Sequence, residues 1–110
     1  MNYKEKLTLL EASFNIKPFL EVADKLKRLD EVTRWVKQNN FDKHGHCQNI
    51  AALYAYVANK FTGIATGGHV AFLHNDKVYD PIYFKDAPTT KKQWEDKFPN
   101  NKEVNLIKLK

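Results

Sequence analysis

The sequence predicts an α+β fold in which a central helix packs on a small antiparallel sheet and further helices precede it. Two observations support this prediction. Apolar residues recur at helical spacing through the first half of the chain, and residues 67–84 then form two β-rich runs separated by Asn75 and Asp76. The 110 residues, of which 43% are hydrophobic, suit a modest core. We therefore expect residues 1–110 to form one domain.

The first half of the chain is expected to be helical. Residues 2–14 fit a short helix or an edge strand, and we favour the helix. Pro18 suits the first position of a helix over residues 18–38, which Asn39 and Asn40 would end. The apolar residues of this second helix recur at steps of three and four: Phe19, Val22, Leu26, Leu29, Val32 and Val36.

The helix expected over residues 47–60 differs from the others because little of its circumference is polar. It carries a stripe of large apolar residues and a stripe of alanines: Ile50, Leu53, Tyr54, Val57 and Phe61, then Ala51, Ala55 and Ala58. A helix that is apolar on most sides lies inside a domain. We expect it to be the central helix, against which the remaining elements pack.

The β-rich segment is expected to be a hairpin whose turn is Asn75-Asp76. That turn sets the pairing of the two strands: His74 with Lys77, Leu73 with Val78, Ala71 with Asp80, and His69 with Ile82. His69 and Asp80 then lie on the same face as diagonal neighbours, about 7–8 Å apart at the backbone. Their side chains can therefore reach each other.

The end of the chain is expected to contain a short helix and a third strand. Residues 89–98 fit the helix, with Trp94 and Phe98 as its anchors. The strand is indicated by apolar residues close to the C-terminus: Val104, Leu106, Ile107 and Leu109.

The net charge of +5 would favour acidic partners, but its distribution does not favour nucleic acid. The lysines are scattered over several elements: Lys25, Lys27, Lys91, Lys92, Lys102, Lys108 and Lys110. The sequence contains neither a secretory signal nor a run of about 18 apolar residues that could span a membrane. We expect a cytoplasmic protein.

The candidate chemistry centres on Cys47, the one cysteine of the chain, which stands at the start of the buried helix. Thiol chemistry requires the thiolate, and a helix N-terminus favours negative charge. A histidine on the hairpin could take the thiol proton, and a carboxylate could orient that histidine. Cys47 would then be the nucleophile, His69 the general base and acid, and Asp80 the orienting residue.

Two other interpretations of these residues stay open. A lone cysteine on an apolar helix is commonly an inert core residue. Zinc is the other alternative, because suitable ligand types gather in a short span: His44, His46, Cys47, His69 and His74. Their spacing matches no standard zinc finger, and the hairpin separates His74 from His69. We therefore expect no metal ligands and no cofactor.

Two segments, "HGHCQNIAALYAYV" and "GGHVAFLHNDKVYDP", are similar to the cysteine helix and to the histidine and acidic strands of the papain-like superfamily of cysteine enzymes. The chain order Cys, His, Asp also resembles that of transglutaminase-like proteins, bacteriocin-leader peptidases and, with a polar third residue, NlpC-type endopeptidases. The resemblance covers about residues 44–83. It implies a minimal papain-like fold, with Cys47, His69 and Asp80 as its catalytic triad.

The resemblance implies a thiol-dependent hydrolase or acyl transferase that acts on a peptide, a protein side chain or a similar acyl substrate. The alternative is a non-enzymatic binding or inhibitory module on the same fold. The short segment between Cys47 and His69 implies a shallow cleft, or one completed by the N-terminal helices or by a protein partner.

The chain departs from the superfamily at the oxyanion site. Members often carry glutamine or another polar residue shortly before the cysteine, whereas the position six residues upstream is Phe41. The backbone N–H of Cys47 can supply one donor to the oxyanion. A second donor could come from Asn40, His46 or Gln48, and the sequence does not choose among them.

Overall fold

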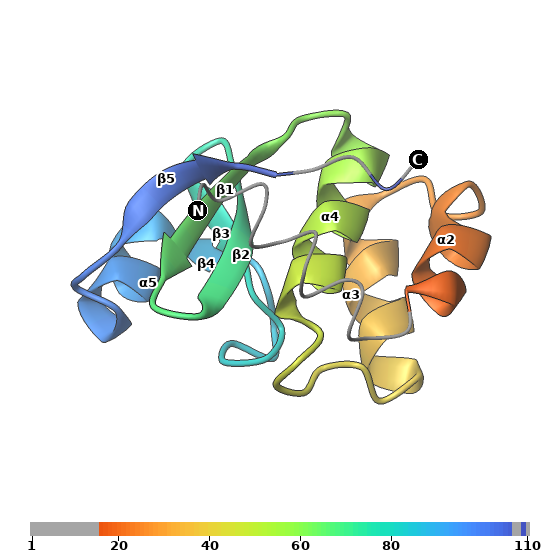
Figure 1. Cartoon of the computed structure of the whole chain (residues 1–110), viewed down its shortest axis with the longest axis horizontal. Coiled ribbons are helices and arrows are strands. Elements are labelled where there is room, and N and C mark those ends of the chain that lie inside the picture. The colour runs from red at the N-terminus through yellow and green to blue at the C-terminus, as the bar shows by residue number, and fades with distance from the viewer. Residues whose placement is uncertain (1–15, 107–108, 110) are drawn as a thin grey trace.

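The computed structural model describes residues 16–106 and 109, and it has the expected α+β architecture (Figure 1). The described helices are α2 (Lys17–Ala23), α3 (Leu29–Gln38), α4 (Cys47–Ala58) and α5 (Lys91–Lys97). The strands are β1 (Thr62–Thr66), β2 (His69–His74), β3 (Lys77–Tyr79), β4 (Thr89–Thr90) and β5 (Lys102–Asn105). They form an antiparallel sheet in the order β4-β3-β2-β1-β5. The helix expected over residues 2–14 lies outside the described residues.

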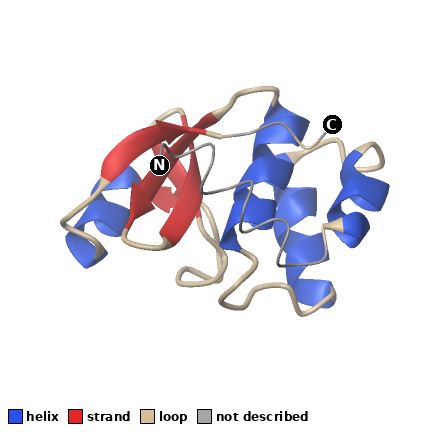
Figure 2. Ribbon diagram, viewed as in Figure 1, coloured by secondary structure: helices blue, strands red, loops and turns tan. Residues whose placement is uncertain are grey.

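The sheet lies between helices on its two faces (Figure 2). Helix α4 packs on β2 with α2 and α3 behind it, and α5 lies on the opposite face. Successive residues of β2 therefore enter different cores, because side chains alternate along a strand. Val70 and Phe72 pack with α4, whereas Ala71 and Leu73 pack with Trp94 of α5.

Helix α4 is the central helix that the sequence predicts. All of its first nine residues are buried, from Cys47 to Ala55. The hydroxyl of Tyr54 has a partner in this interior, since it lies 2.5 Å from Oγ1 of Thr33 on α3. The helix ends at Asn59, whose left-handed backbone (φ 54°) forms the C-cap.

The single helix predicted over residues 18–38 is wrong, because the chain forms two helices there. Arg28 has an extended backbone (φ −134°, ψ 157°) and is the N-cap of α3. The carboxylate of Glu31 accepts hydrogen bonds from the backbone N–H groups of Lys27 (2.8 Å) and Arg28 (2.9 Å). These bonds hold a new helix start. The apolar spacing continues across the break, so periodicity alone does not reveal it.

Strands β1 and β4 are absent from the sequence prediction. β1 contains Gly63, a residue that is rare in strands. It pairs with β2 on one side and with β5 on the other. The predicted third strand is therefore confirmed in part: β5 occupies Lys102–Asn105, while Leu106 and Leu109 lie beyond its end and Ile107 is outside the described residues.

The hairpin turn is confirmed, and so is the predicted register for the pairs next to it. Asn75 and Asp76 both have positive φ angles (51° and 62°), as a two-residue hairpin turn requires. The observed pairs are His74 with Lys77, Leu73 with Val78 and Phe72 with Tyr79. The predicted pairs of Ala71 with Asp80 and of His69 with Ile82 are wrong, because β3 ends at Tyr79 and the backbone N–H of Phe84 donates to the carbonyl of Asp80 (2.8 Å).

None of the helices in the described part of the chain combines the length and apolar character needed to cross a lipid bilayer.

We predict that Gly63→Ala destabilises the fold by about 1–3 kcal/mol. A Cβ at this position would lie 2.7 Å from Cδ2 of Leu106 and 3.0 Å from the carbonyl oxygen of Ala71. Chemical denaturation would measure the change. Gly68→Ala is the matched control, because a Cβ there would meet no atom within 4 Å. Equal stability of the two variants would contradict the close packing at Gly63.

Candidate active site

Cys47 is the first residue of α4, and its sulfur has polar neighbours. Sγ lies 3.1 Å from Oε1 of Gln48 and 3.9 Å from the carbonyl oxygen of Gly68. The residue is only 6% exposed. The N-cap residue His46 provides no side-chain cap, and the N–H groups of Cys47 and Gln48 have no hydrogen-bond partner among the described residues. The sulfur therefore lies beside unpaired backbone donors, which favour negative charge.

His69 and Asp80 are in direct contact. Nε2 of His69 lies 2.7 Å from Oδ2 of Asp80, which is 2% exposed. His69 begins β2 directly after the tight turn that joins β1 to β2, and Asp80 follows the last residue of β3. The structure thus brings together the two residues that the hairpin register places on one face.

Trp94 and the backbone of Tyr83 complete the surroundings of Asp80. Nε1 of Trp94 donates to Oδ2 of Asp80 (2.8 Å), and the backbone N–H of Tyr83 approaches Oδ1 (3.4 Å). One carboxylate oxygen thus accepts from both the indole and the imidazole. The sequence predicts Trp94 only as an anchor of the short helix, and this contact with Asp80 was not predicted.

The pKa of His69 depends on burial, which acts in one direction, and on hydrogen bonds and charges, which act in the other. Burial of the ring lowers the pKa, while hydrogen bonds to Asp80 and to Cys47, and the charges on both, raise it to about 9. Since Nε2 faces Asp80, the other ring nitrogen, Nδ1, is left for the sulfur. At neutral pH the imidazole is therefore protonated, and a positive charge adjoins the thiol.

Aromatic rings enclose His69 on the side away from α4. The ring centroids of Tyr83, Phe98 and Trp94 lie 4.8, 5.7 and 6.3 Å from that of His69. Nζ of Lys97 lies 5.6 Å from the centre of the Tyr83 ring. These rings limit the access of water to the imidazole and its carboxylate, which strengthens their interaction.

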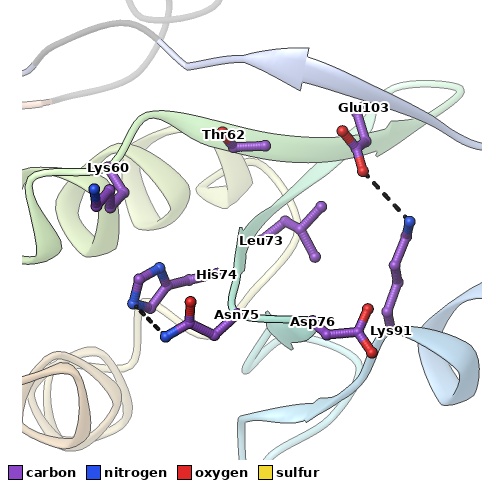
Figure 3. A pocket seen from close by; sticks show the side chains of 8 residues that line it. All are labelled: Lys60, Thr62, Leu73, His74, Asn75, Asp76, Lys91 and Glu103. Atoms are coloured by element: carbon purple, nitrogen blue, oxygen red, sulfur yellow. Dashed lines mark hydrogen bonds and ion pairs between the residues drawn. The ribbon is translucent and has the colours of Figure 1, made fainter.

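The remaining histidines have other contacts, and Nδ1 of His44 lies 3.4 Å from the hydroxyl oxygen of Tyr83. The ring of His46 lies 5.1 Å from Phe41, and burial lowers its pKa. His74 stands at the other end of β2 and lines a separate hollow of about 380 Å³, beside the ion pair of Lys91 and Glu103 (Figure 3). Within residues 16–106 and 109, no three His, Cys, Asp or Glu side chains are grouped to hold a metal ion. The zinc alternative therefore gains no support from the arrangement of these side chains.

Of the three candidates for a second oxyanion donor, Gln48 is the one whose side chain contacts the sulfur. Asn40 follows the C-cap residue of α3 and has a left-handed backbone (φ 58°), and His46 packs on Phe41. The sequence could not make this choice, because it depends on side-chain orientation at the start of α4.

Comparison of the chain with protein-family models, with curated proteins and with solved structures finds no match. The resemblance to papain-like enzymes stays a prediction.

We predict that the protein loses stability as the pH rises from about 6.5 to 9. His69 binds its proton more tightly in the folded state, where its pKa is about 9, than in the unfolded chain, where it is about 6.5. The stabilisation is complete below about pH 6.5 and is lost as the pH passes 9, a change of up to about 3 kcal/mol. Denaturant titrations across this range would measure it. His69→Gln should abolish the slope and His74→Gln should keep it, so an identical slope in both variants would contradict the prediction.

We predict that Trp94→Phe costs about 2–4 kcal/mol and also slows the reaction of Cys47 with iodoacetamide. The change removes the donor to Asp80 and so loosens the orientation of His69. Denaturation and labelling rates would measure the two effects. Trp35→Phe is the matched control, since its indole N–H has no partner among the described residues and its ring packs on Phe19 (5.2 Å). An unchanged labelling rate in Trp94→Phe would show that the indole does not position His69.

Proposed function

We propose that this protein is a thiol-dependent hydrolase or acyl transferase with Cys47 as nucleophile, His69 as general base and acid, and Asp80 as the residue that orients His69. One observation carries the proposal: Nε2 of His69 lies 2.7 Å from the buried carboxylate of Asp80, and Cys47 is close enough to this ring to raise its pKa. Inert cysteines do not need such a partner. The order of groups is the one that activates a nucleophile through a base and an orienting third residue.

The reaction would begin from the thiolate paired with protonated His69. The sulfur attacks the carbonyl carbon of the substrate, a C–S bond forms, and the carbonyl π electrons move to the oxygen. When this intermediate collapses, His69 gives its proton to the leaving group and a thioester remains on Cys47. A water or an acceptor amine or alcohol then attacks the thioester, and His69 takes the proton of that attacking group. The C–S bond breaks, which releases the acyl product and restores the Cys47 thiolate beside protonated His69. Asp80 keeps its charge throughout and stabilises the imidazolium.

The substrate class within this proposal is a peptide, a protein side chain or a similar acyl group. Cys47 is 6% exposed, so the substrate must reach the sulfur through a narrow opening or after a partner protein widens it. A cytoplasmic location stays part of the proposal, since a reducing compartment keeps a single thiol free.

A second candidate is a binding or inhibitory module that uses the same fold without turnover. The low exposure of Cys47 favours it, because a substrate carbonyl must touch the sulfur before any bond can form. The two candidates differ in the reactivity of the thiol: an activated thiolate reacts at low pH, whereas an enclosed thiol does not.

We predict that iodoacetamide labels Cys47 at least about tenfold faster than a free thiol at about pH 6, where free thiols are almost entirely protonated. Asp80→Asn should reduce this rate by about tenfold or more, because the amide can donate to His69 and favours the wrong tautomer. Mass spectrometry of the labelled protein over time would measure the rates.

Two variants serve as controls for the labelling experiment. Cys47→Ala should take up no label, since the chain has no other cysteine. Asp76→Asn, in the exposed hairpin turn, should label at the unmodified rate. Labelling of the unmodified protein no faster than a free thiol would refute the enzyme and leave the binding module.

A further inference from the structure

The side chain of Gln48 is held against the reactive sulfur. Gln48 is 8% exposed, and its carboxamide contacts Cys47 Sγ at 3.1 Å. This is the one hydrogen bond that the side chain makes with any described residue. The buried oxygen of this amide is therefore paired with the thiol of Cys47, as buried polar atoms normally are with some partner.

The carboxamide can turn either its oxygen or its N–H2 group toward the sulfur. With the thiol protonated, S–H donates to the amide oxygen, as observed. Once the proton has left, the sulfur is an acceptor only, and a rotation about the terminal bond of the side chain turns the N–H2 group toward it. The positively charged His69 ring beside the sulfur favours that second state.

We propose that Gln48 supplies the second oxyanion donor of the site, with its side-chain N–H2 acting beside the backbone N–H of Cys47. This inference rests on the proposed function. As the sulfur bonds to the carbonyl carbon, the π electrons of the carbonyl move to the oxygen. This oxygen and the sulfur are then bonded to the same carbon. Oε1 of the Gln48 carboxamide lies 3.1 Å from the sulfur, so after rotation of the terminal bond the N–H2 group is within reach of that oxygen. Gln48 transfers no proton; it stabilises the charge until the oxygen re-forms its double bond.

Two reagents separate this role from activation of the thiol. Acylation by p-nitrophenyl acetate passes through an oxyanion, whereas alkylation by iodoacetamide displaces iodide and forms none. Gln48→Met removes the donor and keeps the approximate size of the side chain. It should slow acylation about 10- to 100-fold and change alkylation by less than about threefold. Equal losses in both reactions, or no loss in either, would overturn the inference.

Gln38→Met is the matched control, since Gln38 is exposed at the end of α3. Both of its rates should stay unchanged. A fall in its acylation rate equal to that of Gln48→Met would overturn the assignment to Gln48.

A second measurement uses the unmodified protein and does not depend on whether Gln48→Met folds. The chain has three glutamines, Gln38, Gln48 and Gln93. With ¹⁵N-glutamine labelling, the side-chain resonances of all three can be followed as acetaldehyde adds to Cys47 and creates an oxygen in the oxyanion position. A shift confined to Gln48 supports the inference, and an unmoved Gln48 resonance in the full adduct overturns it.

Failure of the inference and failure of the proposed function remain distinct. If iodoacetamide labels Cys47 no faster than a free thiol, the enzyme itself is refuted and Gln48 has no oxyanion to bind. If labelling is fast but acylation does not depend on Gln48, the enzyme stands and its second donor lies elsewhere.

Discussion

The buried carboxylate of Asp80 is the constraint on which the rest of the site depends. A charged group at 2% exposure is costly unless donors replace the water that it has lost. Oδ2 receives the imidazole of His69 and the indole of Trp94, at 2.7 and 2.8 Å. These donors come from β2 and α5, so one carboxylate joins the start of a strand to a helix that follows much later in the chain.

The same carboxylate sets the charge of the site. Burial alone would leave the His69 ring neutral, yet its contacts with Asp80 and Cys47 raise its pKa to about 9. Asp80 therefore helps to keep His69 protonated at neutral pH. The other side of the protonated ring is available to the sulfur. Enclosure by Tyr83 and Phe98 strengthens both interactions, because it lowers the local dielectric response.

Local signals allowed the sequence to predict part of this arrangement. The turn residues Asn75 and Asp76 fix the hairpin register, and the two-residue period of a strand then places His69 and Asp80 on one face. Trp94 could not be placed in this way, since its contact with Asp80 depends on how α5 packs over the sheet. The break between α2 and α3 was not predicted, because the apolar spacing continues through it. The hydrogen bonds that mark the break join the Glu31 carboxylate to backbone groups.

The turn between β1 and β2 determines where a substrate could approach. The carbonyl of Gly68 lies 3.9 Å from Cys47 Sγ, while a Cβ added at Gly67 or Gly68 would meet no atom within 4 Å. The backbone of this turn is thus close to the sulfur on its inner side and borders open space on its outer side. The opposite side of the imidazole is closed by aromatic rings. A carbonyl group that reaches the sulfur past this turn would arrive at the start of α4, where the unpaired N–H of Cys47 and the amide of Gln48 lie. In the proposed reaction, the geometry of the turn and the position of these two groups would therefore favour the same direction of attack.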